Sequence, residues 1–102
     1  MKKNGLEISS EKIEKFCRKW KIVEFSLFGS ILQDNFGPES DVDVLVSFSK
    51  EADWSLFDLA IMEQELEEIF GREVDLVEKE FIRNPFRRHS ILTSKEVIYA
   101  AR

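Results

Sequence analysis

Three aspartates and a Gly-Ser pair are the residues of this chain whose types and spacing could support chemistry. Gly29-Ser30 ends one apolar run, and Asp41 and Asp43 open the next one after ten intervening residues. Side chains alternate along a strand, so these two acids should point to the same face, about 7 Å apart along the backbone. Carboxylates so placed repel each other and favour a bound cation. Mg²⁺ suits such a site, because it prefers oxygen ligands and often shares them with a substrate phosphate.

A third carboxylate interrupts a later apolar stretch, where Asp75 stands between Val74 and Leu76. If that strand lies beside the strand of Asp43, three acids could hold two metal ions, an arrangement suited to in-line displacement at phosphorus. A glycine at position 29 would let backbone amides approach a phosphate closely. A serine opening a short helical turn would offer a hydroxyl at the positive end of a helix dipole. Together these residues predict a site for a nucleoside triphosphate.

Each feature also has a purely structural explanation. A Gly-Ser pair can simply be a turn, and an Asp-x-Asp pair can be a solvated strand end or a helix cap. Asp75 could belong to an edge strand. The combination, in this order and between these elements, favours the chemical interpretation.

The elements that must position these residues follow from hydrophobic periodicity. A cap at Ser9 or Ser10 precedes an apolar helical stripe, and Gly71 is placed to end the longest helix. We expect a helix that follows this cap and includes Trp20, helices at 54–70 and 81–92, the last with Pro85 near its first turn, and a helical turn at 31–34. Strands are expected at 22–28, 42–48, 73–77 and 96–100. This alternation predicts an α/β (α+β) fold, with a mixed sheet of three to four strands flanked by helices. Residues 1–8 are expected as a loose lead-in and residues 9–102 as a single domain.

Composition excludes several classes of function. The net charge of −5 argues against a broad nucleic-acid surface, which needs clustered Lys and Arg. Cys17 is the single cysteine, so no intramolecular disulfide can form. No apolar run approaches the roughly 20 residues needed to span a bilayer. The cytoplasm is therefore the expected compartment.

The same residues carry a resemblance to a known family. Gly29-Ser30, ten residues, Asp41-Val42-Asp43 and a later strand with Asp75 resemble the DNA polymerase beta-like nucleotidyltransferase superfamily. Within it, the chain is similar to the minimal nucleotidyltransferases of the MntA type, the antitoxin halves of HEPN/MNT toxin–antitoxin pairs. The segments that carry this similarity are FSLFGS, SDVDVLVSF, SLFDLAIMEQELEEIFGREVDLVE and NPFRRHSILTSKEVIYA.

The resemblance implies a small nucleotidyltransferase fold and a role for each candidate residue. Gly29 and Ser30 would contact the nucleotide phosphates. Asp41, Asp43 and Asp75 would bind two Mg²⁺ ions, and Asp75 would also help to activate the acceptor hydroxyl. The implied reaction is protein adenylylation, in which AMP moves from ATP to a tyrosine of a HEPN ribonuclease toxin and silences it. The implied partners are ATP and that toxin, in a hetero-oligomer, with no direct nucleic acid and no membrane.

One departure from the family pattern concerns the phosphate clamp. Many relatives carry Arg-Gly after the Gly-Ser pair, where this chain has Gln33 and Asp34. Losing a positive charge and gaining a negative one should weaken nucleotide binding. The positive charges that could compensate, or that could be ordinary surface charges, are Arg72, Arg83, Arg87 and Arg88.

The short length bears on the acceptor. Little room remains for an acceptor-binding domain, so a partner is expected to present the hydroxyl, with Phe36, Phe81 and Phe86 as possible contacts. All three could equally be satellite core, which is the favoured interpretation of Phe81. For His89, a surface or partly packed residue is favoured over a general base. Two alternative functions follow. The chain could neutralise a toxin mainly by binding it, with weak or lost catalysis, or, less favoured, it could transfer a nucleotide to a small molecule.

Overall fold

A four-stranded mixed sheet forms the centre of the computed structural model, which describes residues 1–101. Its strands lie in the order β5-β4-β3-β6, with β4 and β5 parallel and the other neighbours antiparallel. The strand bounds are β3 (Ile22–Phe28), β4 (Val42–Phe48), β5 (Val74–Glu78) and β6 (Glu96–Ala100). The predicted fold class is confirmed.

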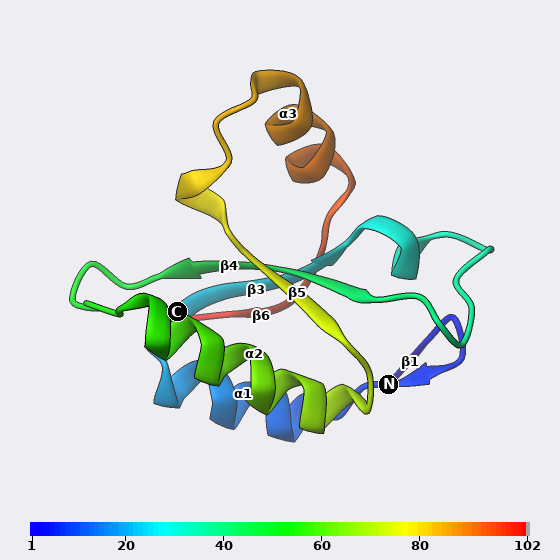
Figure 1. Cartoon of the computed structure of the whole chain (residues 1–102), viewed down its shortest axis with the longest axis horizontal. Helices are drawn as coiled ribbons and strands as arrows, with labels where there is room; N and C mark the ends of the chain where they lie inside the picture. Colours follow the sequence, from blue (N-terminus) through cyan, green and yellow to red (C-terminus); the bar gives the residue numbers. More distant parts are fainter. Residues whose placement is uncertain (102) are drawn as a thin grey trace.

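Helices cover the two faces of this sheet unequally. Helices α1 (Ser10–Lys19) and α2 (Leu56–Phe70) pack on one face, whereas α3 (Pro85–Ser94) stands alone over the other (Figure 1). The larger part of the core lies between the sheet and the first two helices. A smaller cluster beneath α3 consists of Phe28, Leu45, Ile82 and Ile91. Because α3 alone covers this face, part of the face stays open for a site.

Capping residues fix where the helices begin and end. Ser55 and Asp58 form a capping box at the start of α2, and Gly71 ends that helix with a φ of 68°. Asn84 caps α3, and Pro85 takes its first position because a proline there lacks only an N–H that would be unpaired anyway. The prediction that this helix begins at Phe81 is therefore wrong. Residues Lys79–Phe81 instead form a separate 3-10 turn, η2.

The N-terminal residues form a hairpin. Strands β1 (Lys2–Lys3) and β2 (Leu6–Glu7) pair antiparallel around Asn4 and Gly5, both with positive φ. Asn-Gly is the dipeptide that two-residue hairpin turns favour. Leu6 is buried in the core. The segment expected as a loose lead-in therefore differs from that expectation, while a domain boundary at residue 9 stays a prediction.

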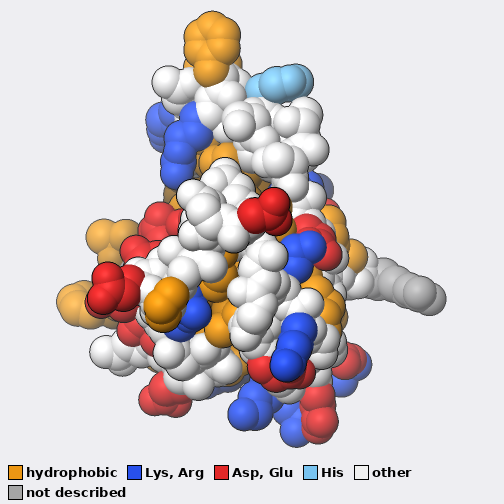
Figure 2. All heavy atoms as spheres, turned by 90° about the vertical axis from the view of Figure 1, so that its right-hand side faces the viewer, with side chains coloured by type: hydrophobic (Ala, Val, Ile, Leu, Met, Phe, Trp, Pro, Cys, Tyr) orange, Lys and Arg blue, Asp and Glu red, His pale blue; other side chains and the backbone are white. Residues whose placement is uncertain are grey.

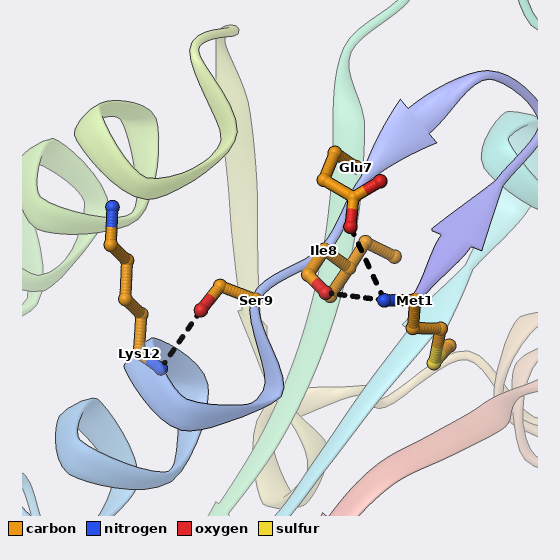
Figure 3. Close-up of polar contacts among 5 residues, drawn as sticks. All are labelled: Met1, Glu7, Ile8, Ser9 and Lys12. Atoms are coloured by element: carbon orange, nitrogen blue, oxygen red, sulfur yellow. Dashed lines mark hydrogen bonds and ion pairs between the residues drawn. The ribbon is translucent and has the colours of Figure 1, made fainter.

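Polar contacts hold the hairpin closed and cap the start of α1. The amine of Met1 lies 3.3 Å from Glu7 Oε1 and donates to the carbonyl of Ile8 over 3.2 Å (Figure 3). Next along the chain, the hydroxyl of Ser9 accepts the N–H of Lys12 at 3.3 Å, as the sequence predicts for a capping serine. Within residues 1–101, no helix is long and apolar enough to cross a membrane.

Candidate active site

The pairing of β4 with β5 brings two of the predicted acids together. Asp43 and Asp75 are register partners in these parallel strands. Register partners point to the same face of a sheet, and Leu45, two residues after Asp43, packs beneath α3. Both carboxylates therefore stand on the α3 side of the sheet. Asp41 comes directly before β4, and its charge acts on Asp43.

Asp43 is partly buried and lies near other negative charges. Burial raises the pKa of its carboxyl above the usual value, and the negative charges of Asp75 and Asp41 raise it further. The backbone N–H of Ser30 and the guanidinium of Arg87 act in the opposite direction. A cluster of like charges with a raised pKa is a feature of functional sites, and a cation would relieve the repulsion.

Gly29 allows the backbone to pass directly against this acid. It has a φ of +74°, and a Cβ placed on it would lie 2.3 Å from Asp43 Oδ2. Any other residue would have to displace the carboxylate. The glycine also begins η1 (Gly29–Leu32), a single turn of 3-10 helix. Because this turn is so short, its backbone N–H groups offer more to an anion than its dipole does.

Ser30 faces the acids with both its backbone and its side chain. Its backbone N–H lowers the pKa of Asp43, and its hydroxyl donates to the backbone carbonyl of Asp41 over a long 3.4 Å. A hydroxyl held so weakly can change partner when an anion binds. The structure thus brings the predicted residues Gly29, Ser30, Asp41, Asp43 and Asp75 to one edge of the sheet.

Asn4 supports η1 from outside, a role that the sequence prediction missed. Its side-chain amide donates to the backbone carbonyl of Ile31 and to that of Gln33, the latter at 2.9 Å. The N-terminal hairpin therefore holds the turn that follows Gly29. The available signal was the Asn-Gly hairpin motif, which places Asn4 at a loop tip.

Arg72 holds the loop on the other side. Its Nη1 donates to the carbonyls of Gly37, at 2.6 Å, and Ser40, at 3.0 Å, and its guanidinium lies 4.4 Å from the centre of the Phe36 ring. These contacts fix the chain that leads into Asp41. Arg72 is thus engaged in positioning the loop.

The other three arginines differ in what they contact. Arg88 Nη1 donates to the carbonyl of Lys79 at 2.7 Å and so anchors α3 to η2. Arg87 lies one helical turn before Ile91, whose side chain is buried against the sheet, and residues four apart share a helix face. Arg87 therefore lies on the face turned toward the acids, consistent with its effect on the pKa of Asp43. Arg83 precedes α3 and is exposed.

A hollow of about 400 Å³ adjoins Gly29 on the side of α3. Its size is that of a small-molecule pocket. Apolar side chains and hydroxyl or amide groups share its lining, which consists of Phe28, Gly29, Leu32, Gln33, Ser90, Ile91 and Ser94. The turn η1 and this hollow therefore meet at Gly29.

The acids fit a divalent cation by their chemistry. Asp43 and Asp75 are adjacent oxygen donors on one sheet face, and their mutual repulsion raises the pKa of Asp43. As the side chains lie, no three His, Cys, Asp or Glu residues among 1–101 form a group that could hold a metal ion. Asp41, Asp43 and Asp75 stay the predicted Mg²⁺ ligands, and their side chains would have to turn toward one another to share an ion.

Of the other candidates, none reaches the acids. Phe36 packs against the main core, and His89 is exposed on α3. Phe86 is exposed on the same helix. Phe81 is 63% exposed, so its interpretation as satellite core is wrong. It follows Lys79 and Glu80 in η2, which turns its side chain outward.

The family model described as Nucleotidyltransferase domain matches residues 9–98. The chain belongs to this family and is a nucleotidyltransferase. It is 35% identical over 81 residues to "Putative protein adenylyltransferase MJ1379" of Methanocaldococcus jannaschii, and the aligned region covers 79% of each chain. A second protein of that organism with the same description, MJ0126, is 29% identical over 93 residues, 91% of each chain.

Solved structures agree in fold. A structure described as a "putative minimal nucleotidyltransferase" superposes with a TM-score of 0.70 at 28% identity, covering 85% of this chain and 86% of that one. A toxin–antitoxin complex with AMP-PNP gives a TM-score of 0.73 at 22% identity, covering 93% and 76%. The resemblance to the minimal nucleotidyltransferases is confirmed.

Proposed function

We propose that this chain transfers AMP from ATP to a hydroxyl, that of a tyrosine, on a HEPN-domain ribonuclease toxin and thereby acts as its antitoxin. The observation that supports the proposal is the pairing of Asp43 with Asp75 on one sheet face beside Gly29, with Asp41 directly before the same strand. Carboxylates on one side and the backbone N–H groups of η1 on the other suit a triphosphate.

The reaction would be an in-line displacement at the α-phosphorus. The acceptor oxygen forms a bond to that phosphorus, the bond to the bridging oxygen of the β-phosphate breaks, and pyrophosphate leaves. Asp75 would accept the hydroxyl proton, while the N–H groups at Gly29 and Ser30 would face the phosphate oxygens. Two Mg²⁺ ions held by the three aspartates would supply charge neutralisation and orientation. The hollow next to Gly29 is large enough to receive the nucleoside.

Descriptions of the structural neighbours support the choice of donor and acceptor. One neighbour is a toxin–antitoxin complex with AMP-PNP. Another is a tri-AMPylated Shewanella oneidensis HEPN toxin with its MNT antitoxin, with a TM-score of 0.64 at 21% identity, covering 90% of this chain and 70% of that one. For this chain, ATP, Mg²⁺ and a HEPN partner are the corresponding proposals.

The test is to incubate the chain with labelled ATP, Mg²⁺ and the HEPN protein encoded beside it. We expect label on the HEPN protein, reduced on the order of 100-fold or more in the Asp41→Asn/Asp43→Asn double variant. Glu68→Gln, an exposed acid on α2 away from the site, is the matched control and should label normally. No label with the wild-type chain would sink the proposal.

A second candidate function is neutralisation by binding alone. Gln33 and the exposed Asp34 motivate it, because neither supplies a positive charge beside the phosphates. Neutralisation of the toxin in cells separates the two functions. The double aspartate variant should fail to protect if transfer is required, and should protect as well as wild type if binding is sufficient.

A further inference from the structure

An apolar groove of about 680 Å³ lies at the end of β4 away from Asp43. It runs between the segment that leads into α2 and the turn η2. Its apolar lining includes Leu56, which is 84% exposed, and Phe81, which is 63% exposed. The other apolar side chains in its wall are Phe48, Ala52, Trp54 and Leu59.

This exposure is not confined to two side chains. Phe57, next to Leu56, is 83% exposed, and Ile61 lies one helical turn further along the outer face of α2. When another surface covers large apolar side chains, their removal from water lowers the free energy. Adjacent exposed residues of this kind mark interaction sites more often than scattered single ones do.

The rim of the groove is acidic. Asp53, Glu78 and Glu80 line it, against one cation, Lys50. Glu80 is held in place by the hydroxyl of Ser47, which donates to its Oε1 at 3.0 Å. Burial raises the pKa of the Glu78 carboxyl, and the neighbouring charge of Glu80 raises it further. A cation placed at this rim would therefore be attracted by both carboxylates and would relieve their repulsion.

We propose that this groove docks a protein segment in which apolar side chains alternate with lysine or arginine. The apolar floor accepts the hydrophobic residues, and the acidic rim pairs with the basic ones. The same rim disfavours acidic peptides and nucleic acids. The exposed apolar side chains and the acidic rim support this docking surface independently of the proposed function. Only the choice of the HEPN protein as the natural source of such a segment rests on the proposed function.

A partner-free experiment tests the chemistry of the occupant. Trp54 lines the groove and packs edge-on against Trp20 with ring centres 5.1 Å apart, so its fluorescence should report occupancy. We would titrate the full chain with a synthetic Leu/Lys amphipathic peptide, and with the same peptide carrying Glu for Lys, at about 0.15 M salt. The basic peptide should saturate the signal, and the acidic one should not bind.

Variants locate the binding. Leu56→Ser and Phe81→Ser alter exposed side chains, so the fold should persist, and each should weaken binding of the basic peptide about tenfold or more. Phe86→Ser is the matched control, because Phe86 is as exposed but lies on α3. Glu80→Gln should weaken binding, whereas Glu39→Gln should not. Equal binding by wild type and groove variants, or equal binding of both peptides, would overturn the proposal.

The remaining arms identify the occupant. With the HEPN protein, groove variants should lose complex formation by sedimentation while still binding ATP, which separates docking from nucleotide binding. If the HEPN protein binds the groove variants as tightly as it binds wild type, the groove is not its docking site and the proposal fails for it. Self-association of the chain that Phe81→Ser abolishes would make a second copy the occupant and overturn the proposal. If wild type labels no HEPN protein, the proposed function fails while the peptide result still decides the groove.

Discussion

At the scale of single residues, two glycines with the same backbone conformation distinguish an effect on stability from an effect on the proposed site. Gly29 and Gly71 have φ values of +74° and +68°, but only at Gly29 would a Cβ meet another atom, Asp43 Oδ2. Alanine at either position should cost roughly 1–2 kcal/mol, because the left-handed conformation disfavours a Cβ. Gly29→Ala should in addition lower the rate of AMP transfer at least about tenfold, because it displaces the Asp43 carboxylate, for which we propose a catalytic role.

Urea denaturation and labelling of the HEPN protein measure the two effects separately. Gly71→Ala should lose stability but keep its transfer rate. Equal transfer rates for the two variants at matched folded fraction would contradict the role of Gly29.

Arg87 and Arg83 form a second matched pair of residues. Both are exposed, but Arg87 lies within α3 and acts on the pKa of Asp43, whereas Arg83 precedes the helix. We predict that Arg87→Gln raises the KM for ATP about fivefold, the equivalent of about 1 kcal/mol for a partly screened charge. Arg83→Gln should leave KM unchanged. The difference between wild type and Arg87→Gln should shrink as salt rises, because solvent ions screen the interaction. An unchanged KM for Arg87→Gln would assign the phosphate contact elsewhere.

The site shows which residues could be predicted from sequence. The three aspartates were singled out because an acid beside or within an apolar strand requires a partner, and the Gly-Ser pair because it ends the preceding strand; their roles stay predictions. What the sequence could not supply is the register that sets Asp43 opposite Asp75, since parallel pairing depends on contacts between distant strands. The separate roles of Arg72 and Arg87 depend on the same distant contacts.

Glu65 joins two elements, α1 and α2, on the covered face of the sheet. Its carboxylate accepts the indole N–H of Trp20 at 2.9 Å and lies 2.5 Å from Lys19 Nζ. Burial alone would raise the pKa of Glu65, but these hydrogen bonds outweigh it, and the pKa lies below the usual value. The ionised form therefore stabilises the fold above the unfolded-state pKa of about 4.5, and this stabilisation is lost as the pH falls through the lower folded-state pKa.

We predict that Glu65→Gln lowers the free energy of unfolding by about 1 kcal/mol at pH 7. Urea denaturation of the variant and wild type measures it, with the exposed Glu68→Gln on the same helix as control. The difference between Glu65→Gln and wild type should narrow below pH 4.5. A constant difference from pH 7 to pH 3 would show that the charge of Glu65 is not what matters.

At the same scale, the elements defined by strong local patterns were predicted well. The strands at 22–28, 42–48 and 96–100 were placed at their observed bounds, because alternation and turn residues mark them clearly. The start of α3 was misplaced, since the apolar residues Phe81 and Ile82 suggested helix while Asn84-Pro85 sets the cap. The hairpin at Asn4-Gly5 was missed because its strands contain only two residues each.

Across the whole molecule, the sheet keeps the proposed activities apart. The acids stand at the start of β4 on the α3 side, and the groove lies at the other end of that strand. The face seen in Figure 2 carries acidic and basic side chains interspersed, with hydrophobic ones at the tip and along one edge. Because the groove and the acids lie at opposite ends of β4, a partner docked in the groove would leave the proposed nucleotide site open to solvent.

Cys17 can report the opening of the whole molecule. It is fully buried in α1, and burial, with the charge of Glu14, raises the pKa of its thiol to about 12. The folded thiol should stay protonated where the unfolded one ionises, so stability should fall as pH rises from about 9 toward 12. At pH 8 a thiol reagent should therefore react with Cys17 only after the core opens.

The reaction rate of Cys17 then measures ligand binding without any partner. A ligand that binds only the folded chain at about 100 times its Kd stabilises it by about 2.7 kcal/mol, which slows labelling by global opening about 100-fold. A non-hydrolysable ATP analogue with Mg²⁺ should give this protection, and the Asp41→Asn/Asp43→Asn variant should lose most of it. Because this readout needs no transfer, protection of wild type without labelling of the HEPN protein would favour a chain that binds nucleotide and neutralises by binding. Equally fast labelling with and without the analogue would show that the acids and Gly29 hold no nucleotide.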